Sequence, residues 1–255
     1  PLHRLFTIAI DISQYSQEDL KMVPSMCNQI MEMPNKVKVI ITVPNKLDSS
    51  QCALARNQLK ELPNLGSPAK NWNNMVKYVD TPYMLVARDI VRFDVNDTRI
   101  ERLIRELPAL GVAAVGGAVR MENNGHWYRG CYSTIYRNFT YVLKSGYRHS
   151  LHECLYCGHL MGPFLTETEF IKKNALKENL PNTVTFYEWF FRAFHVQKKK
   201  FALCPDSMFS IQNIENTNIS REDMLQFAKI HHINIIHKDG QEWSYKCNEV
   251  GVGGA

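Results

Sequence analysis

A guanidinium and a carboxylate stand side by side at the end of the apolar run "TPYMLVARDIV", as Arg88 and Asp89. A carboxylate after a buried strand can hold a divalent cation, which would neutralise a diphosphate, or bind a ribose. An arginine can neutralise the same phosphates directly through charged hydrogen bonds. The next acidic side chain is Asp94, so a metal site, a metal-free phosphate site and a solvated turn are all open readings of this segment.

A second candidate is Glu188, which stands among five aromatic residues in "FYEWFF". If those rings bury the carboxylate, its pKa should rise towards the value that suits a general base. An acceptor hydroxyl needs such a base to lose its proton during transfer. The alternative is a carboxylate near a helix end that faces water.

In the stretch "HECLYCGH", two residues separate Cys154 from Cys157, and His152 and His159 flank the pair. These are zinc-ligand types, but structural zinc sites use a second pair at a distance, and none is spaced for it. A buried pair or a disulfide is therefore favoured. Seven cysteines are present, and one or two disulfides are expected in a secretory compartment.

The elements that position these residues alternate along the first 120 residues. Apolar, β-branched runs predict strands at 5–12, 36–45, 83–91 and 111–121, and helical spacing predicts helices at 16–33, 53–62, 71–79 and 98–107. Such alternation predicts parallel strands with crossover helices. Ligands of these sheets bind at the carboxyl ends of strands, so Asp11, Pro44–Asn45 and Arg88–Asp89 should line one crevice.

The second half of the sequence is less regular. Residues 126–143 are rich in aromatics and fit either strand or helix. Helices are predicted at 166–174, capped by Thr166, at 185–197, and at 220–233, capped by Ser220. A strand is predicted at 199–211, and a hairpin at 233–247 with Asp239–Gly240 as its turn.

Composition excludes few classes of protein. The chain has 255 residues and a net charge of +5, with scattered basic residues and no nucleic-acid-binding motif, so no nucleic acid partner is expected. No apolar run is long enough to span a membrane. The triplets at Asn96, Asn138 and Asn218 match N-glycosylation acceptors and favour the secretory pathway.

Several segments together resemble glycosyltransferases of the GT-A fold. The succession "TPYMLVARDIVRF", "TRIERLIREL" and "VAAVGGAVRM" is similar to the β-1,4-N-acetylgalactosaminyltransferase family of ganglioside synthases. "FYEWFFRAFHVQKKKFALCPDSMF" resembles a later segment of that family, in which an acidic residue precedes paired aromatics. The order of these segments and the closing "DGQEWSYKCN" also resemble the N-terminal GT-A-like domain of fukutin-related protein. The resemblance covers residues 5–248, and "GGAVR" is its most specific part.

The resemblance implies an α/β fold that is GT-A-like, and hence Rossmann-like. A mostly parallel central sheet would be flanked by helices, with a more irregular second half on the acceptor side. A single domain is expected over residues 1–246, with 5–121 as the nucleotide-sugar-binding half and 122–246 as the acceptor-side half. Residues 247–255 would be a linker or the start of a following region, in which Cys247 resembles the first linker cysteine of fukutin-related protein.

The resemblance also assigns roles to individual residues. Glu188 would be the catalytic base. The residues expected to bind the nucleotide sugar are Asp11, Asn71, Arg88 and Asp89, of which Asp89 would also hold Mn²⁺. Those expected to bind the acceptor are Trp127, Gly158 and His159. The metal-binding histidine of the family has no counterpart here, because "CPDSMFSI" offers Asp206, Ser207 and Ser210 instead.

Two functions follow as expectations. The first is inverting transfer of a sugar, with N-acetylgalactosamine as the suggested group, from a UDP-sugar to a glycan hydroxyl on a glycoprotein or glycolipid. The second is a non-catalytic GT-A-like stem domain beside a LicD-type phosphotransferase, which would bind acceptor or support assembly. Both place the chain in the Golgi or endoplasmic reticulum lumen, within a type II membrane protein.

Overall fold

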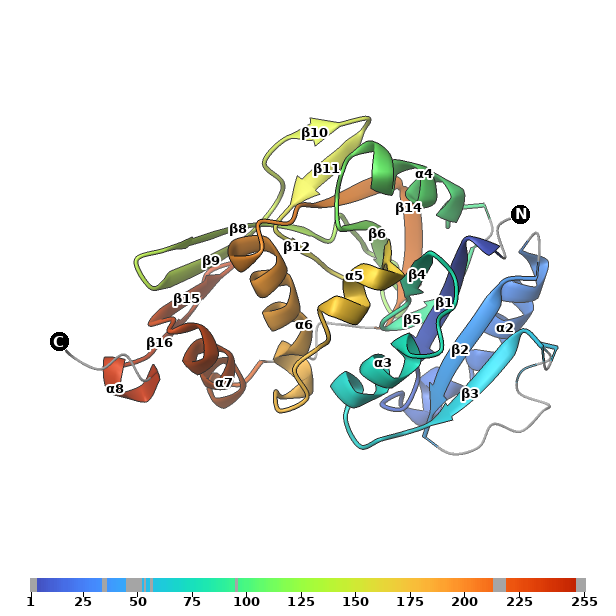
Figure 1. Cartoon of the computed structure of the whole chain (residues 1–255), viewed down its shortest axis with the longest axis horizontal. Coiled ribbons are helices and arrows are strands. Elements are labelled where there is room, and N and C mark those ends of the chain that lie inside the picture. Colours follow the sequence, from blue (N-terminus) through green and yellow to red (C-terminus); the bar gives the residue numbers. More distant parts are fainter. Residues whose placement is uncertain are drawn as a thin grey trace.

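The computed structural model describes residues 4–33, 36–44, 52, 54–55, 57–94, 96–212 and 219–250. Within these ranges the strands form one large and one small sheet (Figure 1). The main path of the large sheet runs through β10 (Ser150–Leu151), β11 (Cys154–Cys157), β14 (Phe201–Ile211), β6 (Ala114–Met121), β13 (Phe164–Glu167), β4 (Tyr83–Val86), β1 (Phe6–Asp11), β2 (Lys38–Val43) and β3 (Leu59–Pro63). Beside this path, β5 (Ile90–Arg92) pairs with β14, and β7 (Trp127–Tyr128) pairs with β6.

The centre of the large sheet is mostly parallel. Strand β1 runs parallel to β2 and β4, and β2 runs parallel to β3. Strand β6 runs parallel to β14, while β13 lies antiparallel between β4 and β6. The parallel arrangement predicted from the alternating first half is confirmed, and it brings the carboxyl ends of β1 and β4 to one edge.

Helices cover both faces of the large sheet. The α-helices in the described ranges are α1 (Gln17–Leu20), α2 (Val23–Glu32), α3 (Pro68–Val76), α4 (Ile100–Ala109), α5 (Thr168–Lys173), α6 (Asn182–Phe191), α7 (Arg221–His231) and α8 (Cys247–Val250). Of these, α7 and α8 pack in the core of the smaller sheet. Helices α2 and α4 pack into one apolar core through Ile30 and Leu103, whereas α3 and α6 pack into another through Trp72 and Trp189. Because strand side chains alternate, Ile8 of β1 faces the first core and Ala9 faces the second.

Local sequence signals explain several helix boundaries. Ser16 and Asp19 form a capping box at the start of α1, and Pro24 lies in the first turn of α2. The single helix expected over 16–33 is therefore two helices. Ser220 caps α7 as predicted, because its side chain accepts a hydrogen bond from the Asp223 amide.

Two further predictions about secondary structure were wrong. Residues 59–62, expected to end a helix at 53–62, lie in the edge strand β3, because pairing with β2 and burial of Leu62 outweigh their helix propensity. Thr166 does not cap a helix. It lies in β13 and donates to the Ala113 carbonyl at 2.7 Å, and Glu167 precedes α5.

The smaller sheet lies at the left of Figure 1 and contains β12 (His159–Leu160), β8 (Cys131–Arg137), β9 (Thr140–Ser145), β15 (Ile235–Lys238) and β16 (Gln241–Ser244). The ambiguous segment 126–143 is thus mainly strand. The predicted hairpin with the Asp239–Gly240 turn is present as β15 and β16. Helix α6, followed by one π-helical turn, η2 (Arg192–Val196), packs Phe191 against α7 and this sheet.

Three disulfides join described cysteines, which is one more than the sequence led us to expect. They are Cys27–Cys52, Cys131–Cys157 and Cys154–Cys204. The zinc alternative for "HECLYCGH" is excluded, because both of its cysteines are bonded to distant partners. Disulfides of this kind are typical of oxidising compartments.

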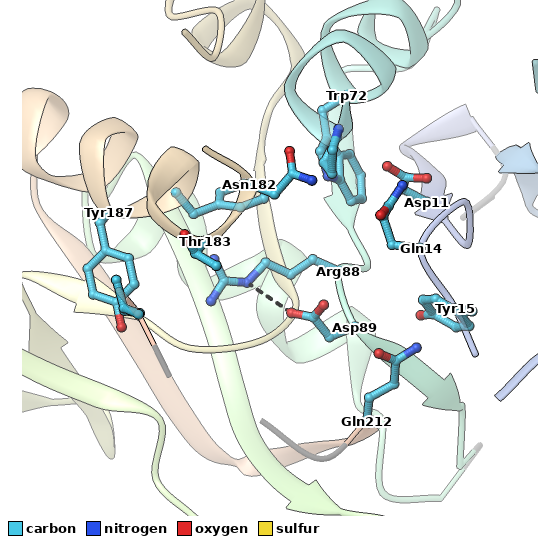
Figure 2. Close-up of a pocket in the computed structure, with 13 residues that line it drawn as sticks. Asp11, Gln14, Tyr15, Trp72, Arg88, Asp89, Asn182, Thr183, Tyr187 and Gln212 are labelled. Atoms are coloured by element: carbon cyan, nitrogen blue, oxygen red, sulfur yellow. Dashed lines mark ion pairs between the residues drawn. The ribbon is translucent and has the colours of Figure 1, made fainter. Parts of the chain in front are cut away.

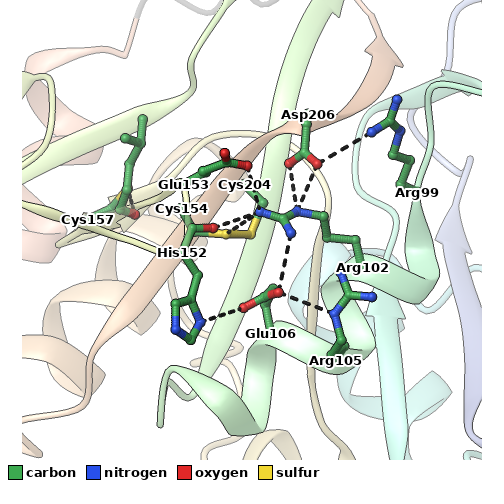
Figure 3. Close-up of a disulfide and its surroundings, with 11 residues drawn as sticks. Arg99, Arg102, Arg105, Glu106, His152, Glu153, Cys154, Cys157, Cys204 and Asp206 are labelled. Carbon is green, nitrogen blue, oxygen red and sulfur yellow. Dashed lines mark hydrogen bonds and ion pairs between the residues drawn. A yellow bond between two sulfur atoms is a disulfide. The ribbon is translucent and has the colours of Figure 1, made fainter.

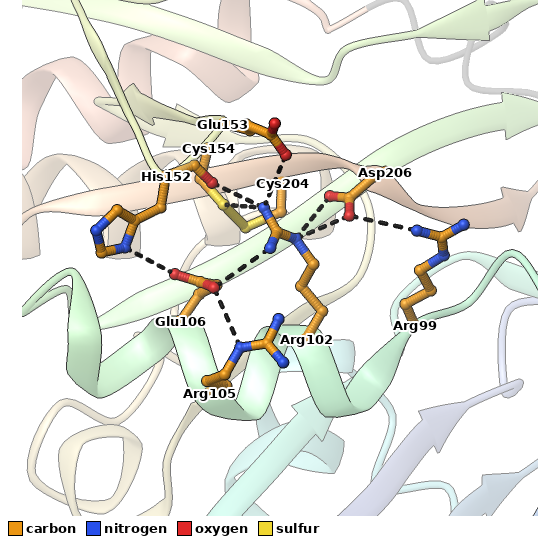
Figure 4. Close-up of polar contacts among 9 residues, drawn as sticks. All are labelled: Arg99, Arg102, Arg105, Glu106, His152, Glu153, Cys154, Cys204 and Asp206. Carbon is orange, nitrogen blue, oxygen red and sulfur yellow. Dashed lines mark hydrogen bonds and ion pairs between the residues drawn. A yellow bond between two sulfur atoms is a disulfide. The ribbon is translucent and has the colours of Figure 1, made fainter.

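The Cys154–Cys204 disulfide lies under a network of charged groups centred on Arg102 (Figures 3 and 4). The Arg102 guanidinium contacts Asp206 at 2.8 Å, Glu106 at 3.3 Å and the His152 carbonyl at 2.7 Å. Its Nη2 also lies 3.8 Å from the Cys154 sulfur. This network ties α4 to β14 and to the turn between β10 and β11.

Some expectations lie outside what the structure describes. Asn45, Asn218 and residues 251–255 fall outside the described ranges. The domain boundaries remain a prediction, although β13 and β14 of the second half lie within the same sheet as the first-half strands. In the described ranges, no helix has both the length and the apolar character needed to cross a bilayer.

Candidate functional site

A pocket of about 350 Å³ opens where the carboxyl ends of β1 and β4 meet the start of α6 (Figure 2). This is the edge at which parallel α/β sheets bind ligands, and the volume is within the range of small-molecule sites. The side chains that line it are Asp11, Gln14, Tyr15, Pro68, Trp72, Arg88, Asp89, Asn182, Thr183, Phe186, Tyr187, Gln212 and Ile219. The predicted meeting of Asp11 with Arg88 and Asp89 is therefore observed.

Arg88 brings a poorly neutralised positive charge to this pocket. Its Nη2 donates to the Leu160 carbonyl at 3.3 Å, its guanidinium lies over the Phe186 ring at 4.6 Å, and its buried Nε has no hydrogen-bond partner among the described residues. An Asp89 carboxylate oxygen lies 3.9 Å from that Nε. Burial lowers the pKa of Arg88, yet a guanidinium stays protonated, so the site favours an anion.

Asp89 is held in an unusual backbone conformation, with φ at +59°. Left-handed backbone at a residue other than glycine is uncommon and clusters at functional sites. The strand breaks here, and the Asp89 carbonyl accepts a hydrogen bond from the Gln212 amide at 2.7 Å. Desolvation raises the pKa of Asp89, although Arg88 opposes the shift. The break turns both charged side chains towards the pocket (Figure 2).

Asp11 is fixed by Asn71 at the other end of the pocket. The Asn71 amide nitrogen donates to Asp11 Oδ2 at 3.1 Å and to Ser13 Oγ at 2.9 Å, and the Ser13 backbone amide donates to Asp11 Oδ1 at 3.0 Å. Burial raises the pKa of Asp11 despite these hydrogen bonds. Asn71 is itself buried and does not line the pocket, so the structure places it as a residue that positions Asp11.

Glu188 does not have the environment expected of a base. Its side chain is fully buried, and Oε1 contacts Arg192 at 3.0 Å, His231 at 3.1 Å and Lys177 at 3.4 Å. Burial alone would raise its pKa, but the hydrogen bonds from His231 and Arg192 and the charges of Arg192 and Lys177 outweigh it, so the pKa is lowered. The expected rise is wrong, because the sequence could not show that three cationic or cationisable groups converge on this carboxylate.

None of the three expected acceptor residues lines the pocket. Trp127 is 46% exposed on β7. His159 is buried under Tyr187, with ring centroids 4.7 Å apart, and its Nδ1 has no hydrogen-bond partner among the residues that the structure describes. A Cβ at Gly158 would lie 2.0 Å from Thr134 Oγ1, so this glycine is needed for packing.

Several lining residues were not singled out from the sequence. Gln14 and Tyr15 come from the turn after β1, Thr183 from the first turn of α6, and Gln212 from the end of β14. These segments are far apart in the chain and carry no common motif. Phe186 belongs to the aromatic run around Glu188, whereas Trp72 lies in a predicted helix far from it in sequence, and only the fold brings the two rings together, with centroids 6.0 Å apart.

The pocket does not provide the ligand set of a preformed metal centre. Asp11 and Asp89 are the carboxylates among its lining residues. In the part of the chain that the structure describes, no three His, Cys, Asp or Glu side chains are grouped so as to hold a metal ion. The expected Mn²⁺ site at Asp89 therefore lacks further protein ligands among these residues, and a guanidinium lies beside it instead.

Solved structures with the same fold are glycosyltransferases. The TM-score is 0.61 with GalNAc-T7, crystallised with UDP, GalNAc and Mn²⁺, at 9% identity over 89% of this chain and 48% of that one. The TM-score with residues 1–349 of TarS from S. aureus is 0.57, at 11% identity over 89% of this chain and 64% of that one. The TM-score with a second TarS structure is 0.55, at 12% identity over 89% of this chain and 38% of that one.

These likenesses show the fold alone, because all the identities are low. The chain has a GT-A glycosyltransferase fold, as the sequence resemblance implied. It spans less than two thirds of the length of each of these neighbours. No protein-family model and no curated protein matches the sequence.

Proposed function

We propose that the chain binds a nucleotide sugar in the pocket between β1, β4 and α6, with Arg88 neutralising the diphosphate. The observation that carries this proposal is the Arg88 guanidinium, which lines the pocket and whose buried Nε has no hydrogen-bond partner among the described residues. Two charged hydrogen bonds to a diphosphate would satisfy it, as in other arginine–phosphate pairs. UDP is the activating group that we propose, on the likeness to GalNAc-T7.

The remaining pocket residues suit the other parts of such a ligand. Tyr15 and Trp72 offer aromatic surface for a base, and Asp11 offers a carboxylate for ribose hydroxyls. Tyr187 on α6 offers aromatic surface on the other side of Arg88, where the sugar would lie (Figure 2). No step of this binding depends on a metal held by the protein.

For the chemistry we propose inverting transfer of the sugar, with N-acetylgalactosamine as the first candidate, to a glycan hydroxyl. The test is to incubate the purified chain with UDP-sugars and glycan acceptors and to measure the release of UDP. Release that requires both substrates supports transfer. Binding of UDP-sugars without any release contradicts it.

A second candidate function has an observation in its favour. Glu188, the residue expected to act as base, forms ion pairs and does not line the pocket. Of the two carboxylates that line the pocket, Asp89 lies next to Arg88, and Asp11 lies on the side of Arg88 away from Tyr187 (Figure 2). A non-catalytic stem domain beside a LicD-type phosphotransferase, in a secretory lumen, would need no base. Glycan binding that persists without any UDP release would favour this candidate.

A further inference from the structure

The turn between β8 and β9 presents an asparagine to solvent. Arg137 pairs with Thr140, so Asn138 and Phe139 form a two-residue turn, with φ of +49° and +56°. Positive φ at both positions is typical of a type I′ turn, and Asn is a favoured first residue there. The Asn138 side chain is exposed, and the hairpin extends to the left edge of the molecule in Figure 1.

The backbone of this turn is held independently of the Asn138 side chain. The Phe139 carbonyl accepts hydrogen bonds from the amides of Asn234 at 2.7 Å and Ile235 at 3.3 Å. The Asn138 carbonyl accepts one from Thr140 Oγ1 at 3.3 Å. A group added to the Asn138 side chain would therefore leave the turn in place and extend into solvent.

The same end of the hairpin exposes apolar surface. Phe139 is 48% exposed, and Ile135, on β8, is 55% exposed. Exposed apolar side chains can favour self-association between copies of a chain. A hydrophilic group attached to Asn138 would lie next to Phe139 in the turn.

We propose that Asn138 carries an N-linked glycan that covers the apolar end of this hairpin. Asn138, Phe139 and Thr140 form an acceptor triplet, and the three disulfides favour the oxidising compartment where such glycans are added. In the transfer, the amide nitrogen of Asn138 bonds to the anomeric carbon of a lipid-diphosphate-linked oligosaccharide. The bond from that carbon to the diphosphate breaks, the diphosphate leaves with the electron pair, and the amide releases a proton to a base of the transferring enzyme.

The triplet at Asn96 has a different environment and serves as the control. Its Thr98 is buried, and the Thr98 hydroxyl donates to the Met208 carbonyl at 2.8 Å. Thr140 is only partly buried. Both hydroxyls donate to a backbone carbonyl, but that of Thr140 lies near the surface in an exposed turn, whereas that of Thr98 is buried in the fold.

The test of attachment uses the chain secreted from animal cells. Release of N-glycans by an amidase in ¹⁸O-labelled water converts each occupied asparagine into labelled aspartate, which peptide mass spectrometry locates without any variant. We expect the label at Asn138, and we expect Asn138→Gln and Thr140→Ala to lose one glycan mass that Asn96→Gln retains. An unlabelled Asn138 in the secreted wild-type chain overturns the proposal.

The test of the covering role compares glycosylated and enzymatically deglycosylated protein by sedimentation velocity. We expect deglycosylation to increase the associated fraction at least twofold, and Ile135→Thr with Phe139→Gly to reverse the increase. Glycine suits the second position of a type I′ turn and keeps the acceptor triplet, so this variant is expected to fold. An occupied Asn138 with no change in association on deglycosylation refutes the covering role.

Discussion

At the scale of single residues, Arg88 defines the pocket more than any carboxylate does. It is a desolvated cation whose Nε has no hydrogen-bond partner in the described part of the chain, and the Asp89 carboxylate lies 3.9 Å from that Nε. Such a group favours a bound anion. Burying this charge lowers the stability of the folded chain, and binding of an anion would offset that loss of free energy.

We expect Arg88→Gln to weaken UDP binding at least tenfold, since a charged hydrogen bond contributes about 1.5–3 kcal/mol. Stability should be unchanged or higher, because the variant removes a buried charge. The measurement is competition against a fluorescent nucleotide, with melting temperature as the check on folding. Arg137→Gln, an exposed arginine on β8, is the matched control and should bind like the wild type. Equal affinities of wild type and Arg88→Gln would contradict the role of Arg88.

For Glu188 we expect an effect on stability and not on nucleotide binding, because the structure gives this residue a stabilising role outside the pocket. Removal of one partner from a buried ion pair costs about 3–5 kcal/mol, so Glu188→Gln, which retains a polar group, should lose about 3 kcal/mol of unfolding free energy. Its affinity for UDP should stay the same, because Glu188 does not line the pocket. Urea denaturation and nucleotide titration test the two parts.

The same substitution should show a defined pH dependence. The pKa of Glu188 lies below its ordinary value of 4.5 in the folded chain, so the unfolded chain binds the proton more readily. The stabilisation by the carboxylate is therefore complete above about pH 4.5 and is lost as the pH falls through the lower, folded-state value. The difference in unfolding free energy between wild type and Glu188→Gln should therefore decrease as the pH is lowered. A difference that increases below pH 4.5 would show that folding raises, rather than lowers, the pKa of Glu188.

At the scale of elements, helix α4 is held to two other segments by one arginine. Arg102 joins Glu106 on its own helix to Asp206 on β14 and to the His152 carbonyl beside the Cys154–Cys204 disulfide. Because both cysteines are fully buried, a reductant reaches them only when this region opens.

We expect Arg102→Leu to lower the unfolding free energy by about 2 kcal/mol, the contribution of a charged hydrogen bond, and to speed reduction of Cys154–Cys204 several-fold. Arg99→Leu is the control, because Arg99 is 58% exposed and contacts Asp206 at 3.6 Å. The rate follows from timed alkylation and peptide mass spectrometry. Equal rates of disulfide reduction in the two variants would show that Arg102 does not keep this region closed.

The elements also show how far sequence reasoning reached. Strong periodic or β-branched runs predicted β1, β2, β4 and β6 correctly, together with α4 and α7. Strand β3 was mistaken for a helix because its state depends on pairing with β2, which no local pattern records. The "GGAVR" stretch was recognised from the sequence, but the need for a glycine there arises from packing between strands of the folded chain. A Cβ at Gly117 would lie 2.1 Å from the Ser207 carbonyl oxygen of β14.

The candidate site was predictable to a similar degree. Asp11, Arg88 and Asp89 were expected together because all three follow strands whose carboxyl ends meet at one edge. Glu188 was misjudged because burial was foreseeable from its aromatic neighbours, whereas its ion pairs with Lys177 and His231 were not. Ion pairs between distant segments leave no periodic signal in a sequence.

At the scale of the whole molecule, helix α6 connects the pocket to both sheets. Its first turns supply Thr183 and Phe186 to the pocket, Trp189 packs in the core of the large sheet, and Phe191 packs against the small one. A ligand that contacts α6 therefore contacts an element shared by both cores. Binding should stabilise the molecule as a unit and raise its melting temperature with increasing ligand concentration.

The most direct test of the central claim is calorimetric titration of UDP into the folded wild-type chain, once with a chelator and once with Mn²⁺. We predict saturable one-to-one binding in both conditions, because Arg88 provides the positive charge for the diphosphate. No binding in either condition would contradict a nucleotide-sugar site in this pocket. Binding that requires Mn²⁺ would contradict the role given to Arg88 and would return that role to a metal at Asp89.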